Sequence, residues 1–220
     1  MNVIKVILVV VFLNLCACYG YASSRIKLNF DFDWKFSLTD HPGYAAIDYS
    51  DANWEQVQLP HDWNIKQKFD RKGIGSAAYL PEGIGWYRKT FFVPQSYKGR
   101  TVSILFDGIF QQSDVYINGK HLGHRPYGFC SIEYDLTPYL HTGKENVIAV
   151  RVNTTGGRPR WYAGAGIYRH VWLTAANPVH VATYGTYITT PEATEDHADV
   201  KIVTTVSNQS DKEQAITVTK

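Results

Sequence analysis

Apolar residues along this chain come in short runs that are separated by Gly, Asn, Asp and Pro. From Arg25 onward, no long stretch keeps the spacing of about three to four residues that an amphipathic helix requires. Short apolar runs between turn-forming residues are typical of β-strands. The pattern therefore predicts an all-β fold for the body of the protein.

Asn118-Gly119 is the clearest predicted turn, because both residues tolerate the positive φ of a type I′ turn. It joins Val115–Ile117 to Lys120–Leu122 in a predicted hairpin. Pro94 ends another strand, since proline has no N–H to donate to a sheet. Many short strands favour an antiparallel sandwich or jelly roll. The remaining strands are expected at 86–93, 102–106, 146–152 and 171–174.

Composition changes at Asn177-Pro178, where a stretch dense in Trp and Gly gives way to one rich in Thr and Val. Beyond this point the pattern predicts about three strands, including 200–204 and 214–220, with a turn at 207–211. A stable sandwich needs about seven strands. We therefore expect residues 25–177 to form one complete domain and residues 178–220 to begin a second, incomplete one that belongs to a longer protein.

The first 22 residues read as a secretory signal. They carry a single charge, Lys5, followed by the apolar run Val6–Leu13, which is too short for a membrane span of about 20 residues. The segment Leu15–Cys18 is similar to a bacterial lipoprotein cleavage box, in which Cys18 would carry the lipid. Ordinary cleavage after Ala22 is the alternative. Both interpretations predict export, to the periplasm or to a lipid anchor at the bacterial outer membrane.

Charge and cysteine content narrow the class of protein further. The 22 Lys and Arg against 20 Asp and Glu give a net charge of +2, without the basic excess of nucleic-acid binders. Cys130 is the one cysteine outside the predicted signal, so no internal disulfide is expected. Its neighbours Tyr127-Gly128-Phe129 favour a small buried hydrophobe over a catalytic thiol. His121 and His124 form the one close histidine pair, with no Cys or acid immediately beside them, so no metal or cofactor is predicted.

An ordered set of motifs spans most of the first domain. In this order they resemble the amino-terminal region of family 2 glycoside hydrolases, and within that family the bacterial β-galactosidase branch, over roughly Ile26 to Ala175. The motifs are Trp34-Lys35-Phe36, Leu59-Pro60-His61-Asp62-Trp63, Gly85-Trp86-Tyr87-Arg88-Lys89, Phe106-Asp107-Gly108, Val115–Gly119, Leu122-Gly123, Tyr134-Asp135-Leu136, Asn146–Val150 and Trp161–Arg169.

The resemblance implies a galactose-binding-like jelly roll, followed by an immunoglobulin-like sandwich and a catalytic barrel. Such enzymes hydrolyse terminal β-linked sugars with retention, using two glutamates about 5 Å apart. Both glutamates lie in the barrel, which this chain does not reach, so we expect no catalytic residue here and no activity from these 220 residues alone. Glu55, Glu82, Glu133 and Glu145 occupy separate settings and are interpreted as surface carboxylates.

The same resemblance implies a substrate contact in the loop 158–163. There Arg160 stands where several relatives carry a carboxylate, so it is expected to donate hydrogen bonds to the sugar or to brace the barrel. The rings of Trp161 and Tyr162 are expected to pack against the apolar face of a sugar. Packing of these rings against the barrel is the alternative.

His61-Asp62 suggests acid–base chemistry at first sight. Adjacent side chains on an extended segment point to opposite faces, so these two are poorly placed to pair, and no Gly-x-Ser-x-Gly elbow is present. Asp62 is instead expected to stabilise the turn after Pro60, with Trp63 in the core.

These observations lead to one main hypothesis and two alternatives. The chain is expected to be the front part of an exported exo-β-glycosidase of carbohydrate catabolism, with β-galactosidase as the leading candidate. Its partners would be a β-linked oligosaccharide or galactoside and its own downstream barrel, with homo-oligomer formation left open. The alternatives are an autonomous carbohydrate-binding module of a cell-surface protein and a structural domain that serves oligomer contacts.

Overall fold

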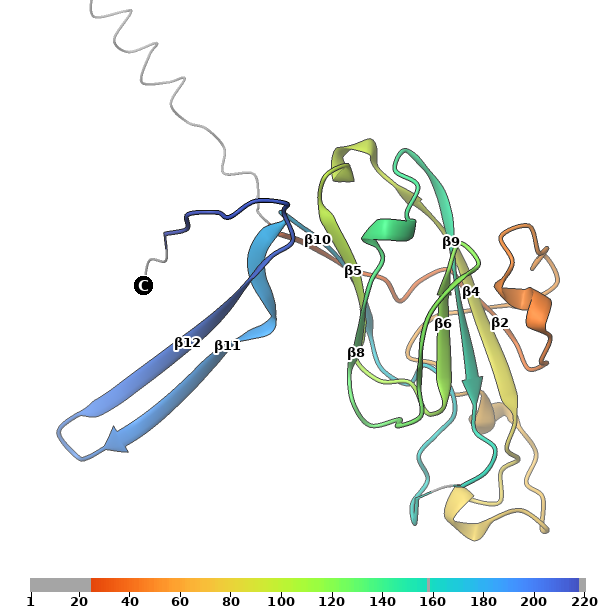
Figure 1. Ribbon diagram of the computed structural model, residues 1–220. Coiled ribbons are helices and arrows are strands. Elements are labelled where there is room, and N and C mark those ends of the chain that lie inside the picture. Colours follow the sequence, from red (N-terminus) through yellow and green to blue (C-terminus); the bar gives the residue numbers. More distant parts are fainter. Residues whose placement is uncertain (1–24, 158, 218–220) are drawn as a thin grey trace, which may run out of the picture.

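A computed structural model of the chain describes residues 25–157 and 159–217, so the predicted signal and Cys18 lie outside the described residues. The first part is a sandwich of two antiparallel sheets (Figure 1). The four-stranded sheet has the order β1 (Arg25–Asn29), β10 (Val171–Ala176), β5 (Thr101–Phe106), β8 (Ile132–Asp135). The six-stranded sheet has the order β3 (Glu55–Val57), β2 (Trp34–Ser37), β4 (Ile84–Val93), β9 (Lys144–Asn153), β6 (Ser113–Ile117), β7 (Lys120–Arg125).

The hydrophobic core lies between these two sheets. Ile148, Val150 and Val152 alternate along β9, and all three side chains are fully buried. Ile104 and Phe106 from β5 belong to the same buried cluster. The predicted jelly-roll sandwich is therefore confirmed.

The turn between β6 and β7 also forms as expected. Asn118 and Gly119 have φ values of 48° and 77°, the left-handed conformation that a type I′ turn requires. The Asn118 side chain accepts a hydrogen bond from Val147 N at 2.9 Å and donates to Asn146 Oδ1 at 2.7 Å. This asparagine therefore fixes the hairpin to β9 as well as shaping the turn.

Short 3₁₀ turns complete the described fold: η1 (Pro42–Ala45), η2 (Trp63–Lys66), η3 (Gly75–Ala77), η4 (Gln95–Tyr97) and η5 (Thr137–Tyr139). No helix in the described part of the chain is long and apolar enough to cross a membrane. The segment that contains η1 covers the outer face of β4. Arg88 is therefore 1% exposed, and its guanidinium donates to Asp51 Oδ2 at 3.1 Å and to the carbonyls of Tyr44, Ala46 and Tyr49.

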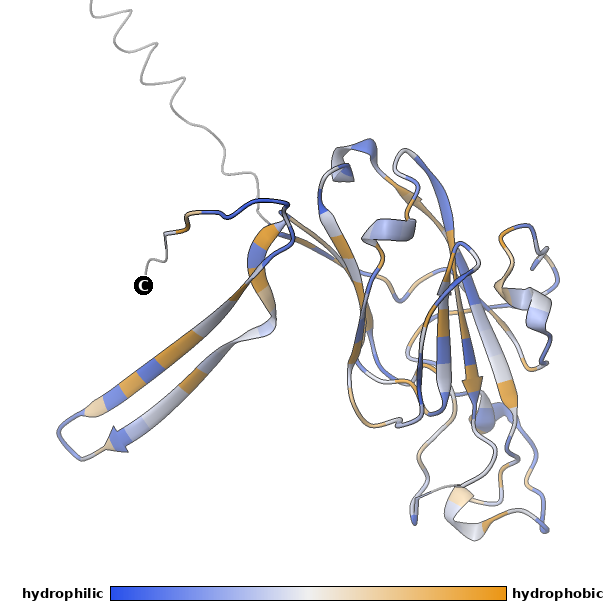
Figure 2. Ribbon diagram, in the orientation of Figure 1, coloured by the Kyte–Doolittle hydropathy of each residue, from blue (hydrophilic) through white to orange (hydrophobic). Residues whose placement is uncertain are grey.

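Beyond the sandwich, β11 (Val179–Ala193) and β12 (Ala198–Asn208) form a separate two-stranded hairpin that projects from the sheets (Figure 1). Apolar and polar residues alternate along β12 (Figure 2). Ile188 and Ile202 face each other across the strands, yet they are 60% and 55% exposed.

Two expectations for this region were wrong. Residues 214–217 form no strand, since the structure places no neighbouring strand beside them to supply hydrogen bonds, and 218–220 lie outside the described residues. The described part of 178–220 consequently holds two strands instead of about three.

Candidate functional site

One end of the sandwich gathers the loops that carry the predicted site. The register places Ile84 opposite Asn153, and Ser113 opposite both Val152 and Arg125, so the starts of β4 and β6 lie beside the ends of β7 and β9. Four loops meet at this end, at the bottom of Figure 1. They span residues 62–83, 107–112, 126–131 and 154–170.

Asp62 connects two of these loops. Its Oδ1 accepts hydrogen bonds from Asn64 N at 2.9 Å, where it caps η2, and from Ala165 N at 3.0 Å. Its Oδ2 accepts a hydrogen bond from the Tyr162 hydroxyl. Trp63, which follows, is 2% exposed. The expected structural role of Asp62 and Trp63 is confirmed, and the bonds to the distant loop 160–166 extend that role.

Gly166 allows this loop to lie close to the core. Its φ is +120°, and a Cβ at this position would lie 2.2 Å from the Tyr87 hydroxyl and 2.8 Å from the His61 carbonyl oxygen. Its backbone also pairs with Phe110, through N–O distances of 2.9 and 3.0 Å. The loop is therefore attached to the segment 61–64 on one side and to Phe110 on the other.

His61 has a structural setting. It is 9% exposed, and its Nδ1 lies 2.9 Å from the Tyr87 hydroxyl. Burial lowers the pKa of His61 and raises that of Tyr87, so both side chains are neutral at pH 7. Since Asp62 bonds to Tyr162 and to backbone N–H groups, the two neighbours do not pair, as the sequence predicted.

The three predicted substrate contacts are separated by the structure. Arg160 is exposed. Trp161 is 59% exposed and its ring contacts Phe129 at a centroid distance of 5.8 Å. Tyr162 has different neighbours from Trp161, because its hydroxyl donates a hydrogen bond to Asp62. It lines an open pocket of about 310 Å³, together with Ile65, Gln67, Phe69, Ala78 and Leu80.

An aromatic strip, which we define as Tyr127, Phe129 and Trp161, lies next to this loop. Tyr127 is 62% and Phe129 38% exposed, and Cys130 is exposed as well, so the expectation of a buried cysteine among core residues was wrong. The cause is Gly128, whose backbone lies directly on Phe110: a Cβ there would be 2.5 Å from the Phe110 ring. The backbone of Gly128 therefore packs against the core, and the side chains of Tyr127 and Phe129 on either side of it are exposed.

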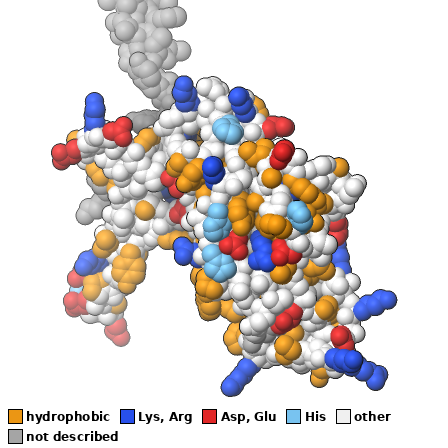
Figure 3. All heavy atoms as spheres, turned by 45° about the vertical axis from the view of Figure 1, so that its right-hand side comes forward, with side chains coloured by type: hydrophobic (Ala, Val, Ile, Leu, Met, Phe, Trp, Pro, Cys, Tyr) orange, Lys and Arg blue, Asp and Glu red, His pale blue; other side chains and the backbone are white. Residues whose placement is uncertain are grey.

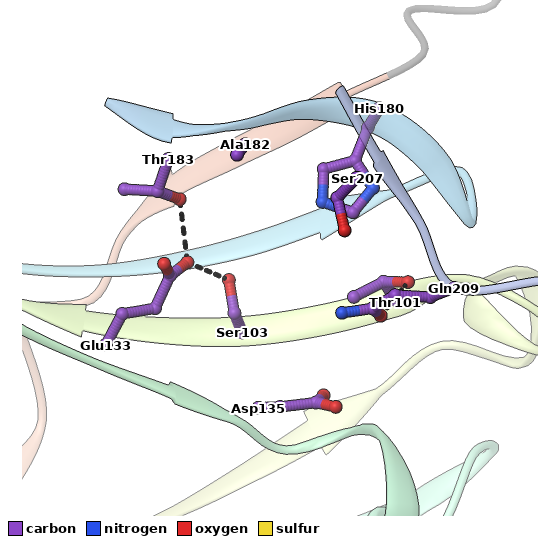
Figure 4. A pocket seen from close by; sticks show the side chains of 9 residues that line it. All are labelled: Thr101, Ser103, Glu133, Asp135, His180, Ala182, Thr183, Ser207 and Gln209. Carbon is purple, nitrogen blue, oxygen red and sulfur yellow. Dashed lines mark hydrogen bonds between the residues drawn. The ribbon is translucent and has the colours of Figure 1, made fainter. Parts of the chain in front are cut away.

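The glutamates show no mutual contacts among the described residues. Glu55 contacts Lys66, and Glu82 Oε2 accepts a hydrogen bond from Gly156 N at 3.3 Å. Glu133 points into a pocket of about 230 Å³ between the sandwich and the hairpin, where its Oε1 accepts bonds from Ser103 and Thr183, both at 2.8 Å (Figure 4). Polar bonds of this kind attach the hairpin to the sandwich.

The His121 and His124 pair has an acidic neighbour that sequence spacing did not reveal. Asp114 comes from the paired strand β6, and its Oδ1 lies 2.9 Å from His121 Nε2 and 3.1 Å from His124 Nδ1. Arg151 stands beside this group and bonds to Asp40. Figure 3 shows histidine, acidic and basic side chains gathered on one face. Within the described residues no group of three such ligands is arranged to hold a metal ion.

Comparisons with known proteins identify relatives. The family model "Glycosyl hydrolases family 2, sugar binding domain" matches residues 27–177. Beta-galactosidase BoGH2A of Bacteroides ovatus is 44% identical over 210 residues, and a putative beta-glucuronidase of Formosa agariphila is 41% identical over 194 residues. These alignments cover 94% and 86% of this chain but 25% and 18% of those proteins.

Solved structures with a similar fold include enzymes of the same kinds. A beta-glycosidase from Bacteroides vulgatus superposes with a TM-score of 0.80 at 39% identity, covering 85% of this chain and 25% of that one. A beta-glucuronidase from glycoside hydrolase family 2 gives a TM-score of 0.78 at 35% identity, covering 86% and 22%. The chain thus spans about a quarter of the length of the proteins it matches.

Proposed function

Because the chain belongs to glycosyl hydrolase family 2, whose sugar-binding domain covers residues 27–177, we propose that it is the amino-terminal part of an exo-acting, retaining β-galactosidase of carbohydrate catabolism. The observation that carries this proposal is the 44% identity to a β-galactosidase along nearly the whole chain. Retaining hydrolysis needs two carboxyl groups about 5 Å apart. In this proposal the downstream barrel supplies both, and the 220-residue chain alone is inactive.

Within the parent enzyme, the loop 160–162 contacts the terminal sugar. The exposed ring of Trp161 covers the apolar face of the sugar, and Arg160 donates hydrogen bonds to its hydroxyls. The Tyr162 hydroxyl is bonded to Asp62, so Tyr162 contributes its ring while its hydroxyl fixes the loop. Asp62 therefore acts as a positioning residue for this contact.

The hairpin β11–β12 begins the second domain of the parent. A two-stranded hairpin is marginally stable in water, and this one exposes Tyr187, Ile188 and Ile202. Further strands from residues beyond Lys220 would cover these side chains and complete an immunoglobulin-like sandwich. This accounts for the alternation of apolar and polar residues in a segment that lacks a core of its own.

Expression of the longer gene product tests the proposed activity. The parent should hydrolyse nitrophenyl β-galactoside faster than nitrophenyl β-glucuronide, whereas the 220-residue chain should hydrolyse neither. A preference for the glucuronide would contradict the galactosidase assignment, and turnover by the pure 220-residue chain would contradict the assignment of catalysis to the barrel.

Export is a further part of the proposal. An amino-terminal leader directs the protein out of the cytoplasm, and acylation of Cys18, which stays in the mature protein on this route, anchors it to the membrane. The same assay on cell fractions distinguishes the two processing routes. Activity should move from the membrane to the soluble periplasmic fraction in the Cys18→Ser variant, and an unchanged distribution would favour cleavage after Ala22.

A further inference from the structure

The hairpin β11–β12 carries a large bulge close to the sandwich. Its two strands pair up to Val181 and again from Thr186, and the four residues 182–185 in between lie opposite Thr205 alone. A Cβ at Gly185 would lie 2.9 Å from the Thr205 carbonyl oxygen, so this backbone path requires a glycine. Bulges redirect a strand and the side chains that it carries. The bulge therefore gives the base of the hairpin a shape of its own.

The bulge brings Thr183 to the sandwich. The Thr183 hydroxyl donates to Glu133 Oε1 at 2.8 Å, and the Ser103 hydroxyl donates to the same oxygen at 2.8 Å (Figure 4). Glu133 lies on β8 and Ser103 on the neighbouring strand β5. Hydrogen bonds to a carboxylate are stronger than those between neutral groups. One carboxylate oxygen thus connects the hairpin to two strands of the sandwich.

Other polar contacts support the base of the hairpin on both of its strands. Thr101 donates to Gln209 Oε1 at 2.8 Å, just beyond β12, and the Gln209 N–H donates to the Pro178 carbonyl oxygen at 2.9 Å. On the side of β11, the Arg25 guanidinium donates to the Val181 carbonyl oxygen. The hairpin is therefore attached through hydrogen bonds at its base.

Apolar burial contributes little to this attachment. The pocket of about 230 Å³ around Glu133 is lined mainly by polar side chains, and a second open pocket of about 460 Å³ extends past Arg100 to Pro178. The exposed Ile188 and Ile202 lie beyond the bulge. Parts of a chain that share a small polar interface move relative to each other by default. The angle of the hairpin consequently depends on the directional bonds at its base.

The covalent connection is short, since only Asn177-Pro178 separates β10 from β11. Short segments between rigid elements are the usual positions of hinges. We propose that Asn177-Pro178 is a hinge and that Glu133 is the latch that holds it at one angle. When the bond from Thr183 to Glu133 breaks, the hairpin pivots away from the four-stranded sheet. In the parent, the latch sets the angle between the first two domains, and this last step rests on the proposed function.

Electron–electron distance measurements on the 220-residue chain test the latch without any turnover. One spin label is placed on the exposed Cys130 of the sandwich and the other on the hairpin, in Ile202→Cys, with Cys16 and Cys18 replaced by serine. The unaltered latch should give one narrow distance distribution. Thr183→Val removes the hydroxyl and keeps the side-chain size, so the ratio of pivoted to latched molecules should rise about tenfold, equivalent to about 1.4 kcal/mol.

Three further variants show whether the acceptor at Glu133 is responsible. Glu133→Ala should broaden the distribution as Thr183→Val does, and the double variant should add little, because both changes remove the same bond. Glu133→Gln should stay closer to the unaltered chain, since its amide oxygen still accepts. Thr186→Val is the matched control, because Thr186 is exposed on the same strand beyond the bulge. Circular dichroism of each variant verifies that the sandwich is folded.

Two results would overturn the proposal. One is a distribution that stays narrow in both Thr183→Val and Glu133→Ala, which would mean that the remaining contacts fix the hairpin. The other is an equal broadening in Thr186→Val, which would mean that the hairpin frays without a hinge. Neither result depends on the proposed enzyme activity. An inactive parent would leave the latch intact, and a failed latch would leave the galactosidase assignment intact.

Discussion

Removal of the Asp62 carboxylate should destabilise the sandwich and release the loop that carries Trp161. In Asp62→Ala, η2 loses its cap, which costs about 1 kcal/mol. The N–H of the buried Ala165 is left without its acceptor, which costs about 1–3 kcal/mol. The bond from the Tyr162 hydroxyl is also lost, but water replaces it at this exposed position. A loss of about 3 kcal/mol is expected.

Asp62→Asn separates the contributions. An amide oxygen still accepts from the two backbone N–H groups, so this variant should lose about 1 kcal/mol. Urea unfolding followed by tryptophan fluorescence measures both variants, with the midpoint converted through a common slope. Tyr162→Phe completes a double-mutant cycle with Asp62→Ala and isolates the hydroxyl–carboxylate bond.

The reasoning would be refuted by either of two results. One is a loss below about 1 kcal/mol in Asp62→Ala, which would mean that Ala165 N–H finds another partner. The other is equal destabilisation by Asp62→Asn and Asp62→Ala, which would mean that charge rather than the acceptor geometry matters.

Two further predictions concern backbone geometry and pH. Gly166→Ala should abolish soluble folding, because its Cβ would meet the Tyr87 hydroxyl. Gly156→Ala should cost only about 1 kcal/mol for its positive φ, because nothing lies within 4 Å of the added Cβ. Circular dichroism of both variants checks this difference, and a folded Gly166→Ala would contradict it. The pKa of Asp40 lies below its usual 3.8, mainly because Arg151 donates hydrogen bonds to it, so the unfolded chain takes up this proton first as the pH falls. The resulting stabilisation is present above about pH 4 and is lost as the pH falls through the folded-state pKa of Asp40. The urea midpoint should therefore fall less steeply with decreasing pH in Arg151→Gln than in the wild type. Parallel curves of midpoint against pH for the two proteins would contradict this prediction.

Local chemistry made much of the sandwich predictable. Asn118-Gly119 specifies its turn through the backbone conformation that both residues tolerate, and the alternation of Ile148, Val150 and Val152 marks the face of β9 that packs into the core. Pro94 ended β4 as expected because it lacks an N–H. Each of these signals depends on only a few neighbouring residues, so each can be recognised in the sequence.

Long-range contacts decided what could not be predicted. Arg88 reads as a polar residue of a strand, but the segment 38–54 covers it and supplies four acceptors. Asp62 finds two of its partners on the loop 160–166, and nothing in the local sequence marks them. Tyr127 and Phe129 turn outward because Gly128 sits against Phe110, a contact between separate loops.

The pairing of β1 with β10 has a consequence for the use of this domain as a building block. Arg25 lies opposite Ala176 in the sheet, so the chain enters and leaves the sandwich at neighbouring points. A domain with adjacent ends tolerates circular permutation and insertion into a host loop, because neither operation stretches the backbone. A short bridge from Ala176 to Arg25, with new ends at the exposed Gly156, would keep every strand of the sandwich in register.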